Sequence, residues 1–266
     1  MCIRDRYLND RLILQADNMF RSWIADIREF LEPGENNLRI TFHSPVKSGL
    51  EKLKALDYKF PDPPNDLSEI GGLGDRKVSI FTRKAPYHFG WDWGPRLVTS
   101  GIWKEVTVWG WDMARIKNVF VQQAGVSEKK ADLKIHLEIE STGSRTLELE
   151  GMVNGEKTMH TTVSLEPGLN EISEPINIAD PDLWWPNGLG EQPLYDLKFT
   201  LRDGDELIAE AKTRTGLRDI RVVREKDQAG ESFFFRVNGH PVFMKGANYI
   251  PQDVFPVSYT HLRAHE

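Results

Sequence analysis

A loop between Gly90 and Trp103 holds the side chains best suited to binding a ligand, three tryptophans and one aspartate. Its glycines and proline predict a fixed loop rather than a helix or a strand. Indole rings are costly to leave in water, so Trp91 and Trp93 should face either a core or a ligand. Against a sugar the set is complementary, because an indole covers the C–H face of a pyranose while the carboxylate of Asp92 accepts hydrogen bonds from hydroxyls.

The same residues also fit a purely structural interpretation. The loop is then a corner of a β-sandwich, with Trp91 packed inside and Asp92 capping a turn. Residue types alone favour this corner, although a buried carboxylate needs partners. His88, just before the loop, also has two interpretations: it touches a substrate, or it is a structural histidine with satisfied hydrogen bonds. The seven histidines show no metal-ligand spacing, and the sequence predicts no metal and no cofactor.

A longer stretch around the loop carries a family resemblance. Residues 84–103 read Lys-Ala-Pro-Tyr-His-Phe-Gly-Trp-Asp-Trp-Gly-Pro-Arg-Leu-Val-Thr-Ser-Gly-Ile-Trp, which resembles the signature of β-mannosidases of glycoside hydrolase family 2. In that family this loop leaves an N-terminal sugar-binding-like domain, reaches over the active site of a barrel and holds the mannosyl unit. The resemblance implies that Trp91 and Trp93 shape a sugar pocket and that Asp92 binds mannose hydroxyls.

A second segment near the C-terminus carries the same resemblance. Residues 245–253 resemble the end of the first strand of the family's (β/α)₈ barrel, a fold in which the C-terminal end of each strand faces the active site. Asn248 is therefore a secondary candidate for substrate binding. The alternative, a turn residue that satisfies loop amides, has equal weight.

The resemblance implies a reaction whose catalytic groups the sequence does not contain. Retaining glycosidases use two carboxyl groups about 5–5.5 Å apart, and in family 2 both are glutamates on later barrel strands. No glutamate of this chain matches either position, so no catalytic residue is assigned. The complete enzyme is expected to remove terminal non-reducing β-D-mannose with retention, and the chain itself is expected to be inactive.

Two other functions remain open at this point. A sibling specificity of family 2, β-galactosidase or β-glucuronidase, shares the order of domains and differs in the loop at 90–95. A non-catalytic carbohydrate-binding protein made of β-sandwiches is the alternative outside enzymes. The hairpin expected at 233–248, which would lead into a barrel, argues against this alternative, because a binding protein made only of β-sandwiches does not require it.

The elements that position these residues are predicted to be strands, in an all-β chain of several domains. A galactose-binding-like jelly-roll domain, truncated at its front, spans 7–112, and an immunoglobulin-like β-sandwich spans 113–216. Residues 217–256 resemble the start of a TIM barrel. Residues 1–6 and 257–266 resemble translated sequencing-adapter read-through and are placed outside the fold, with genuine polar tails as the alternative.

Periodicity locates individual elements within these domains. Apolar residues alternate in 38–42 and 133–139, which predicts half-buried strands. Helical spacing of apolar residues marks 46–56. Strands are also expected at 78–81, 104–111 and 242–248, and hairpin turns at Asn9-Asp10, Asn154-Gly155 and Asn238-Gly239. The Trp184-Trp185 loop resembles another family 2 feature and is interpreted as a packed corner without a ligand.

Composition limits the remaining functions. The chain has 266 residues, of which 39% are hydrophobic and 28% charged, as in ordinary globular proteins. A formal net charge of −6 argues against nucleic acid or an anionic membrane as a partner, and no apolar run is long enough to span a bilayer. The single cysteine, Cys2, excludes an internal disulfide. With the resemblance, the expected partners are β-mannoside oligosaccharides or glycans; the compartment and the oligomeric state stay open.

Overall fold

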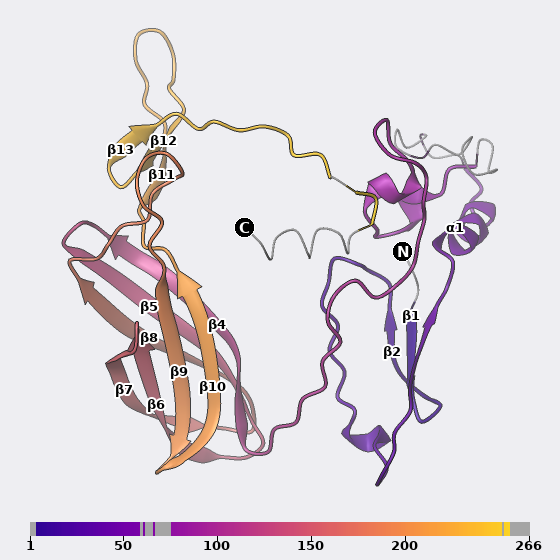
Figure 1. Cartoon of the computed structure of the whole chain (residues 1–266), viewed down its shortest axis with the longest axis horizontal. Helices are drawn as coiled ribbons and strands as arrows, with labels where there is room; N and C mark the ends of the chain where they lie inside the picture. The colour runs from indigo at the N-terminus through magenta and orange to yellow at the C-terminus, as the bar shows by residue number, and fades with distance from the viewer. Residues whose placement is uncertain (1–3, 59–60, 62–65, 67–75, 252, 256–266) are drawn as a thin grey trace. The chain divides into compact units, whose positions relative to one another are not determined.

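The computed structural model describes residues 4–58, 61, 66, 76–251 and 253–255 (Figure 1). The chain divides into two compact units. The first unit comprises Met1–Thr107 together with Asn248–Glu266, and the second comprises Val108–Ala247. The tail predicted at 257–266 lies outside the described residues. The predicted domain boundaries, including the one between 112 and 113, stay predictions.

The first unit contains a three-stranded antiparallel sheet in the order β2-β1-β3. Its strands are β1 (Arg4–Leu8), β2 (Arg11–Ala16) and β3 (Leu38–Phe42). Asn9 and Asp10 form the turn between β1 and β2 with positive φ angles of 49° and 61°, a geometry that asparagine and aspartate tolerate. The predicted hairpin and the predicted strand at 38–42 are both confirmed.

Residues 4–6 lie inside this sheet, although the sequence placed them in a tail outside the fold. They belong to β1, which pairs with β2 on one side and β3 on the other. Asp5 is buried there and accepts hydrogen bonds from His43 and Gln15 at 2.8 and 3.1 Å. The hydrogen bond from His43 lowers the pKa of Asp5. The origin of this segment stays a prediction.

The described residues of the first unit also include one α-helix. Helix α1 (Pro45–Lys54) begins with Ser44 accepting a hydrogen bond from the Lys47 N–H, and Pro45 occupies the first turn, where a missing N–H costs nothing. The described part of the unit also has three short 3₁₀ helices: η1 (Arg28–Phe30), η2 (Ser79–Phe81) and η3 (Pro86–Phe89). A small core of Val78 and Phe89 packs beside α1.

Two strands predicted for the first part of the chain are absent. Residues 79–81 form η2 instead, because the carboxylate of Asp66 accepts hydrogen bonds from the N–H groups of both Val78 and Ser79 and draws the chain into a tight turn. Residues 104–111 form no strand, and Val106 and Val108 are exposed. A segment of residues that prefer β-structure becomes a strand only where a partner strand completes its backbone hydrogen bonds.

The second unit contains a β-sandwich, which agrees with the prediction. One sheet has the order β4-β5-β8 and the other β10-β9-β6-β7. All pairs within these sheets are antiparallel. The strands are β4 (Ala114–Val126), β5 (Lys130–Ser141), β6 (Arg145–Val153), β7 (Glu156–Leu165), β8 (Gly168–Ala179), β9 (Tyr195–Asp203) and β10 (Glu206–Thr215).

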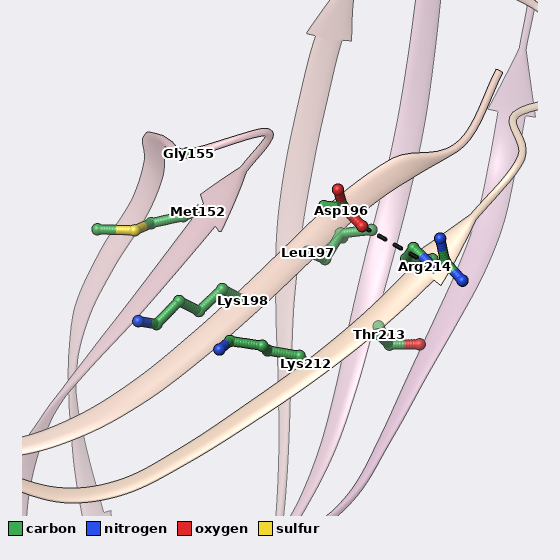
Figure 2. A pocket seen from close by; sticks show the side chains of 8 residues that line it. All are labelled: Met152, Gly155, Asp196, Leu197, Lys198, Lys212, Thr213 and Arg214. Atoms are coloured by element: carbon green, nitrogen blue, oxygen red, sulfur yellow. Dashed lines mark ion pairs between the residues drawn. The ribbon is translucent and has the colours of Figure 1, made fainter.

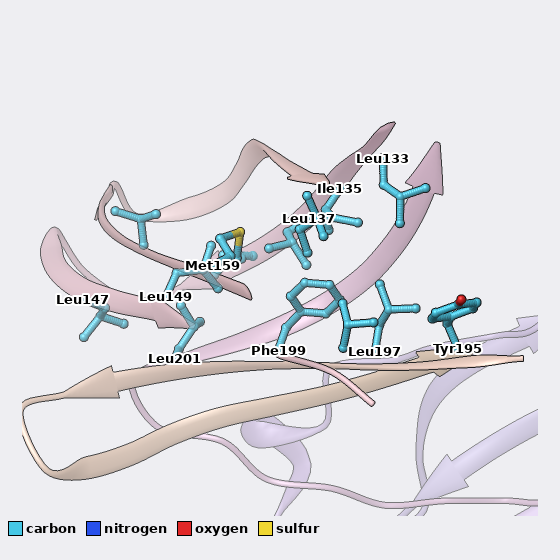
Figure 3. Close-up of a cluster of buried hydrophobic side chains, with 14 of the residues drawn as sticks. Leu133, Ile135, Leu137, Leu147, Leu149, Met159, Tyr195, Leu197, Phe199 and Leu201 are labelled. Atoms are coloured by element: carbon cyan, nitrogen blue, oxygen red, sulfur yellow. The ribbon is translucent and has the colours of Figure 1, made fainter. Parts of the chain in front are cut away.

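Side chains that alternate along these strands fill the space between the two sheets. Figure 3 shows Leu133, Ile135 and Leu137 of β5 facing Leu197 and Phe199 of β9. All five are buried, and the residues between them on β5 are more exposed. The predicted period of two at 133–139 is therefore confirmed. The turn between β6 and β7 uses Asn154 and Gly155 at positive φ, as the hairpin motif predicted.

A smaller sheet follows the sandwich in the order β11-β12-β13. Its strands are β11 (Ile220–Val223), β12 (Phe234–Val237) and β13 (His240–Val242), and Asn238 and Gly239 form the predicted turn at positive φ. The strand predicted at 242–248 is wrong beyond Val242: Phe243 is 84% exposed, and residues 243–250 form no regular element. No barrel segment is seen among the described residues, because a parallel strand needs neighbours to pair with.

The Trp184-Trp185 loop, which connects β8 to β9, is hydrogen-bonded to the segment that leads into the small sheet and to that sheet's β12–β13 turn. The Trp184 N–H donates to the Leu217 carbonyl at 2.8 Å, and the Asn238 side chain donates to the Trp184 carbonyl at 3.1 Å. Each indole lies against a glycine: a Cβ atom on Gly216 would lie 2.7 Å from Trp184, and one on Gly190 would lie 2.8 Å from Trp185. The interpretation of this loop as a packed corner is confirmed.

Candidate functional site

The Trp91-Asp92-Trp93 trio lies in one tight turn of the first unit. The Trp91 N–H donates to the Gly94 carbonyl at 3.1 Å, and the Gly94 N–H donates back to the Trp91 carbonyl at 3.3 Å. Gly90 enters the turn with a φ of 101°, a conformation that favours glycine. Two reciprocal backbone hydrogen bonds therefore fix the base of the turn and leave Asp92 and Trp93 at its tip.

The side chains of the turn face outward rather than into a core. Trp91 is 40% exposed, Asp92 is exposed, and Trp93 is half-buried. The alternative interpretation, a sandwich corner with Trp91 packed inside, required a buried Trp91 and is wrong for the described structure. An exposed indole beside an exposed carboxylate is the combination that can stack on a sugar ring and accept hydrogen bonds from its hydroxyls.

Trp93 is supported from behind by the aromatic residues of η3. The ring centroid of Tyr87 lies 5.7 Å from that of Trp93 at an interplanar angle of 45°, and 4.8 Å from that of His88 in a stacked arrangement. Helix η3 starts at Pro86, whose fixed φ suits a first helical turn, and ends where the Gly90 N–H donates to the Tyr87 carbonyl at 3.1 Å. These contacts fix one face of the Trp93 ring.

His88 is fully buried, as the structural interpretation predicted, and it does not face solvent. The expected satisfied hydrogen bonds are not found: neither ring nitrogen has a hydrogen-bond partner among the described residues. The pKa of His88 is lowered to about 4, chiefly by burial and also by the Lys84 cation, while the backbone of Leu97 partly opposes them. The imidazole is therefore neutral at pH 7 and fills space behind the turn.

A buried ion pair follows the turn, and sequence reasoning missed it. The Arg96 Nε atom lies 3.3 Å from the Asp66 Oδ1 atom, and the two side chains are only 6% and 0% exposed. Asp66 lies 30 positions earlier in the chain. No periodic pattern connects the two residues, so only the fold brings them together.

Asn248 is the fourth candidate. It is exposed and belongs to no regular element, and none of the described contacts joins it to the turn. The chain returns to the turn a few residues later, because Val254 is buried and a Cβ atom on Gly94 would lie 3.0 Å from its Cγ1 atom. A role for Asn248 in binding stays a prediction.

A cavity among the described residues lies elsewhere, on the sandwich. It measures about 590 Å³ and is lined by residues of β6, β9 and β10 and the β6–β7 turn (Figure 2). Lys198 and Lys212 both pair with Glu210, at 2.6 and 2.8 Å, and Arg214 lies 3.9 Å from Asp196. The two lysines share the Glu210 carboxylate and Arg214 faces Asp196, so two carboxylates oppose three cations and one formal positive charge is left over.

The described residues also limit other chemistry. They include no group of three or more histidine, cysteine, aspartate or glutamate side chains arranged to hold a metal ion. No helix in this part of the chain is both long and apolar enough to cross a bilayer. The exposed turn at 91–94 remains the candidate functional site.

Two domain families match consecutive parts of the chain. Residues 3–104 match the galactose-binding-like domain of glycosyl hydrolase 2, and residues 114–218 match glycosyl hydrolases family 2. The chain therefore belongs to glycoside hydrolase family 2. The predicted galactose-binding-like and immunoglobulin-like domains of a mostly β chain are confirmed, whereas the predicted barrel segment is not shown.

Within this family the chain is similar to β-mannosidases. It is 34% identical to β-mannosidase B of Emericella nidulans over 255 residues, covering 92% of this chain and 28% of that protein. Identity to the Aspergillus clavatus β-mannosidase B is 32%, over 95% of this chain and 29% of that protein. The crystal structure of a β-D-mannosidase from Dictyoglomus thermophilum matches with a TM-score of 0.83 at 36% identity, over 96% of this chain and 31% of that chain.

A more distant structure shares the fold alone. The exo-chitosanase of Amycolatopsis orientalis matches with a TM-score of 0.69 at 22% identity, over 96% of this chain and 27% of that chain. The chain thus spans less than a third of the length of each of these relatives.

Proposed function

We propose that the protein containing this chain is an exo-β-mannosidase that removes terminal non-reducing β-D-mannose with retention of configuration. Membership in family 2 and similarity to β-mannosidases over more than 90% of the chain support this proposal. Hydrolysis is proposed for the whole protein, because no glutamate of this chain matches the two carboxyl groups that the reaction needs. The proposed substrates are β-mannoside oligosaccharides or glycans.

The proposed role of this chain is to hold the mannosyl unit. Trp91 stacks on the C–H face of the sugar, Asp92 accepts hydrogen bonds from its hydroxyls, and Trp93 closes one side of the pocket. The observation that carries this proposal is the exposure of Trp91 and Asp92 on a turn whose backbone is closed by two hydrogen bonds. A rigid turn presents these groups without a large loss of entropy on binding.

The test compares Asp92→Ala with the wild type in the whole protein on aryl β-mannosides. Each charge-assisted hydrogen bond is worth about 1.5–3 kcal/mol, so losing two should lower kcat/KM by roughly 100-fold or more. The matched control is Asp205→Ala, which removes an exposed aspartate from a hairpin turn of the sandwich and should leave kcat/KM unchanged.

Two outcomes would contradict the proposal. Equal kcat/KM in Asp92→Ala and the wild type would remove Asp92 from the site. Faster hydrolysis of aryl β-galactosides or β-glucuronides than of β-mannosides would assign the protein to a sibling specificity of the family.

A further inference from the structure

Buried ionisable groups gather around the candidate turn. Asp66 and His88 are fully buried, Lys84 is 8% exposed, and the side chain of Arg96 is 6% exposed. Charged residues are rarely buried unless they are paired, because the low-dielectric interior penalises an isolated charge. Such groups collect at functional sites more often than elsewhere.

The Arg96–Asp66 pair forms a continuous chain of contacts with the small core. One carboxylate oxygen of Asp66 lies 3.3 Å from Arg96 Nε. The other accepts hydrogen bonds from the N–H groups of Val78 and Ser79, at 2.6 and 3.0 Å. Val78 is fully buried and packs tightly on α1, where a Cβ atom on Gly49 would lie 2.8 Å from its own Cβ. The guanidinium is thereby linked to the buried cluster of Val78 and Phe89 that packs beside α1.

The turn is attached to this anchor at both ends. Arg96 is separated from Gly94 only by Pro95, whose ring fixes φ and limits the freedom of the link. On the other side, fully buried Phe89 immediately precedes Gly90, and the Arg96 guanidinium carbon lies 5.8 Å from the centre of the Phe89 ring. The same guanidinium therefore contacts the chain that enters the turn and is covalently close to the chain that leaves it.

Apolar packing fixes the tip only in part, because Trp93 packs against Tyr87 whereas Trp91 and Asp92 are exposed. Trp91 and Asp92 are exposed, so apolar burial contributes little to holding them. The two backbone hydrogen bonds close the turn but do not fix its orientation relative to the rest of the unit. The direction in which Trp91 and Asp92 point depends on how the flanking residues are anchored, and the anchor that follows the turn is polar.

We propose that Arg96 and Asp66 are positioning residues: their buried ion pair sets the orientation of the Trp91–Gly94 turn for binding the sugar. The sugar-binding part rests on the proposed function, whereas the positioning of the turn does not. A buried ion pair is a weak source of net stability, and its replacement by neutral groups of similar size is often tolerated. The pair is therefore expected to control the order of the turn more strongly than the stability of the fold.

The first experiment measures the turn directly in this chain by ¹⁹F NMR after incorporation of 5-fluorotryptophan. Signals of Trp91 and Trp93 are assigned with single Trp→Phe variants among the eight tryptophans. In Arg96→Gln, these two signals should shift toward the unfolded position or broaden, while the other six stay in place. The matched control is Arg28→Gln, which removes an exposed Arg28–Asp26 pair from the same unit and should leave all signals unchanged.

A second pair of variants separates positioning from folding. Arg96→Lys keeps the charge but loses the planar fork, so it should restore the signals only in part. Asp66→Asn with Arg96→Gln replaces the ion pair by two amides, one of which still accepts from the Val78 and Ser79 amides. This double variant should unfold at the wild-type temperature within a few degrees and still show the displaced signals. Loss of folding in both it and Arg96→Gln would overturn the proposal in favour of a purely structural pair.

The kinetic readout belongs to the whole protein. A misplaced binding group costs up to about 100-fold, so Arg96→Gln should lower kcat/KM on aryl β-mannosides by roughly 10- to 100-fold. Unmoved Trp91 and Trp93 signals in folded Arg96→Gln would refute positioning, whatever the activity. The two proposals can also fail separately. If the signals move in Arg96→Gln but the wild-type whole protein hydrolyses no β-mannoside, the proposed function is refuted and the positioning proposal stands.

Discussion

The buried imidazole of His88 should make the stability of the first unit depend on pH. Its pKa is about 4 in the folded chain, against an ordinary value of 6.5. Above pH 6.5 the ring is neutral in both the folded and the unfolded chain, and it contributes no pH dependence. Below 6.5 the unfolded chain takes up a proton that the folded chain does not, so the free energy of unfolding falls as pH drops. The decline ends near pH 4, where the folded chain is protonated too.

The size of the effect follows from these two values. Each pH unit between them is worth about 1.4 kcal/mol, so His88 should reduce the free energy of unfolding by about 3 kcal/mol between pH 6.5 and pH 4. Replacing the ring by one that cannot titrate removes this contribution. His88→Phe keeps an aromatic ring beside Tyr87, and it also removes two buried ring nitrogens that have no described partner.

The assay is urea denaturation at a series of pH values from 4 to 7.5. Resolved ¹⁹F signals of 5-fluorotryptophan report the two units separately. The first unit holds Trp23, Trp91, Trp93 and Trp103, and the second holds Trp109, Trp111, Trp184 and Trp185. The stability difference between His88→Phe and the wild type should grow by about 3 kcal/mol toward pH 4, because contributions of all other titrating groups cancel. The control is His160→Gln, an exposed histidine on the sandwich. Parallel pH curves for His88→Phe and the wild type would refute the reasoning.

Two further predictions concern the sandwich. Gly216→Ala places a Cβ atom 2.7 Å from Trp184 and should destabilise the second unit by about 1–3 kcal/mol in urea denaturation. The control is Gly110→Ala, whose added Cβ atom would have no other atom within 4 Å. Equal losses of stability in both variants would show that the Trp184 indole does not pack against Gly216. Phe199→Ala empties a fully buried position and should cost about 3–5 kcal/mol, seen as a lower midpoint for the second unit alone. A cost below 1 kcal/mol would contradict the core of Figure 3.

Local sequence patterns predicted the elements that their own residues specify. The alternation at 133–139 specifies β5 because each inward residue meets the opposite sheet, and the Asn-Gly pairs specify turns because their residues tolerate positive φ. The strands expected at 78–81 and 104–111 failed for a non-local reason. Asp66 competes for the amides of the first segment, and no described strand pairs with the second.

The candidate site was predictable only in part for the same reason. Glycine and proline around Trp91-Asp92-Trp93 predicted a fixed loop, and the turn is there, with Trp91 exposed. Residue types alone favoured a packed corner, since nothing in a linear pattern tells whether an indole faces a core or solvent. The ion pair between Arg96 and Asp66 depends on two residues 30 positions apart that no period relates.

The contrast between the two units explains why a polar anchor is needed beside the turn. In the sandwich, a large cluster of buried aliphatic and aromatic residues holds the strands, so loops can be fixed by apolar packing alone. Beside the turn, the described cluster has only Val78 and Phe89 fully buried. A core of this size cannot orient a loop whose own indoles must stay exposed for a ligand. A charge pair excluded from water has a defined geometry, so it can fix the orientation of the turn, whereas apolar burial is not directional.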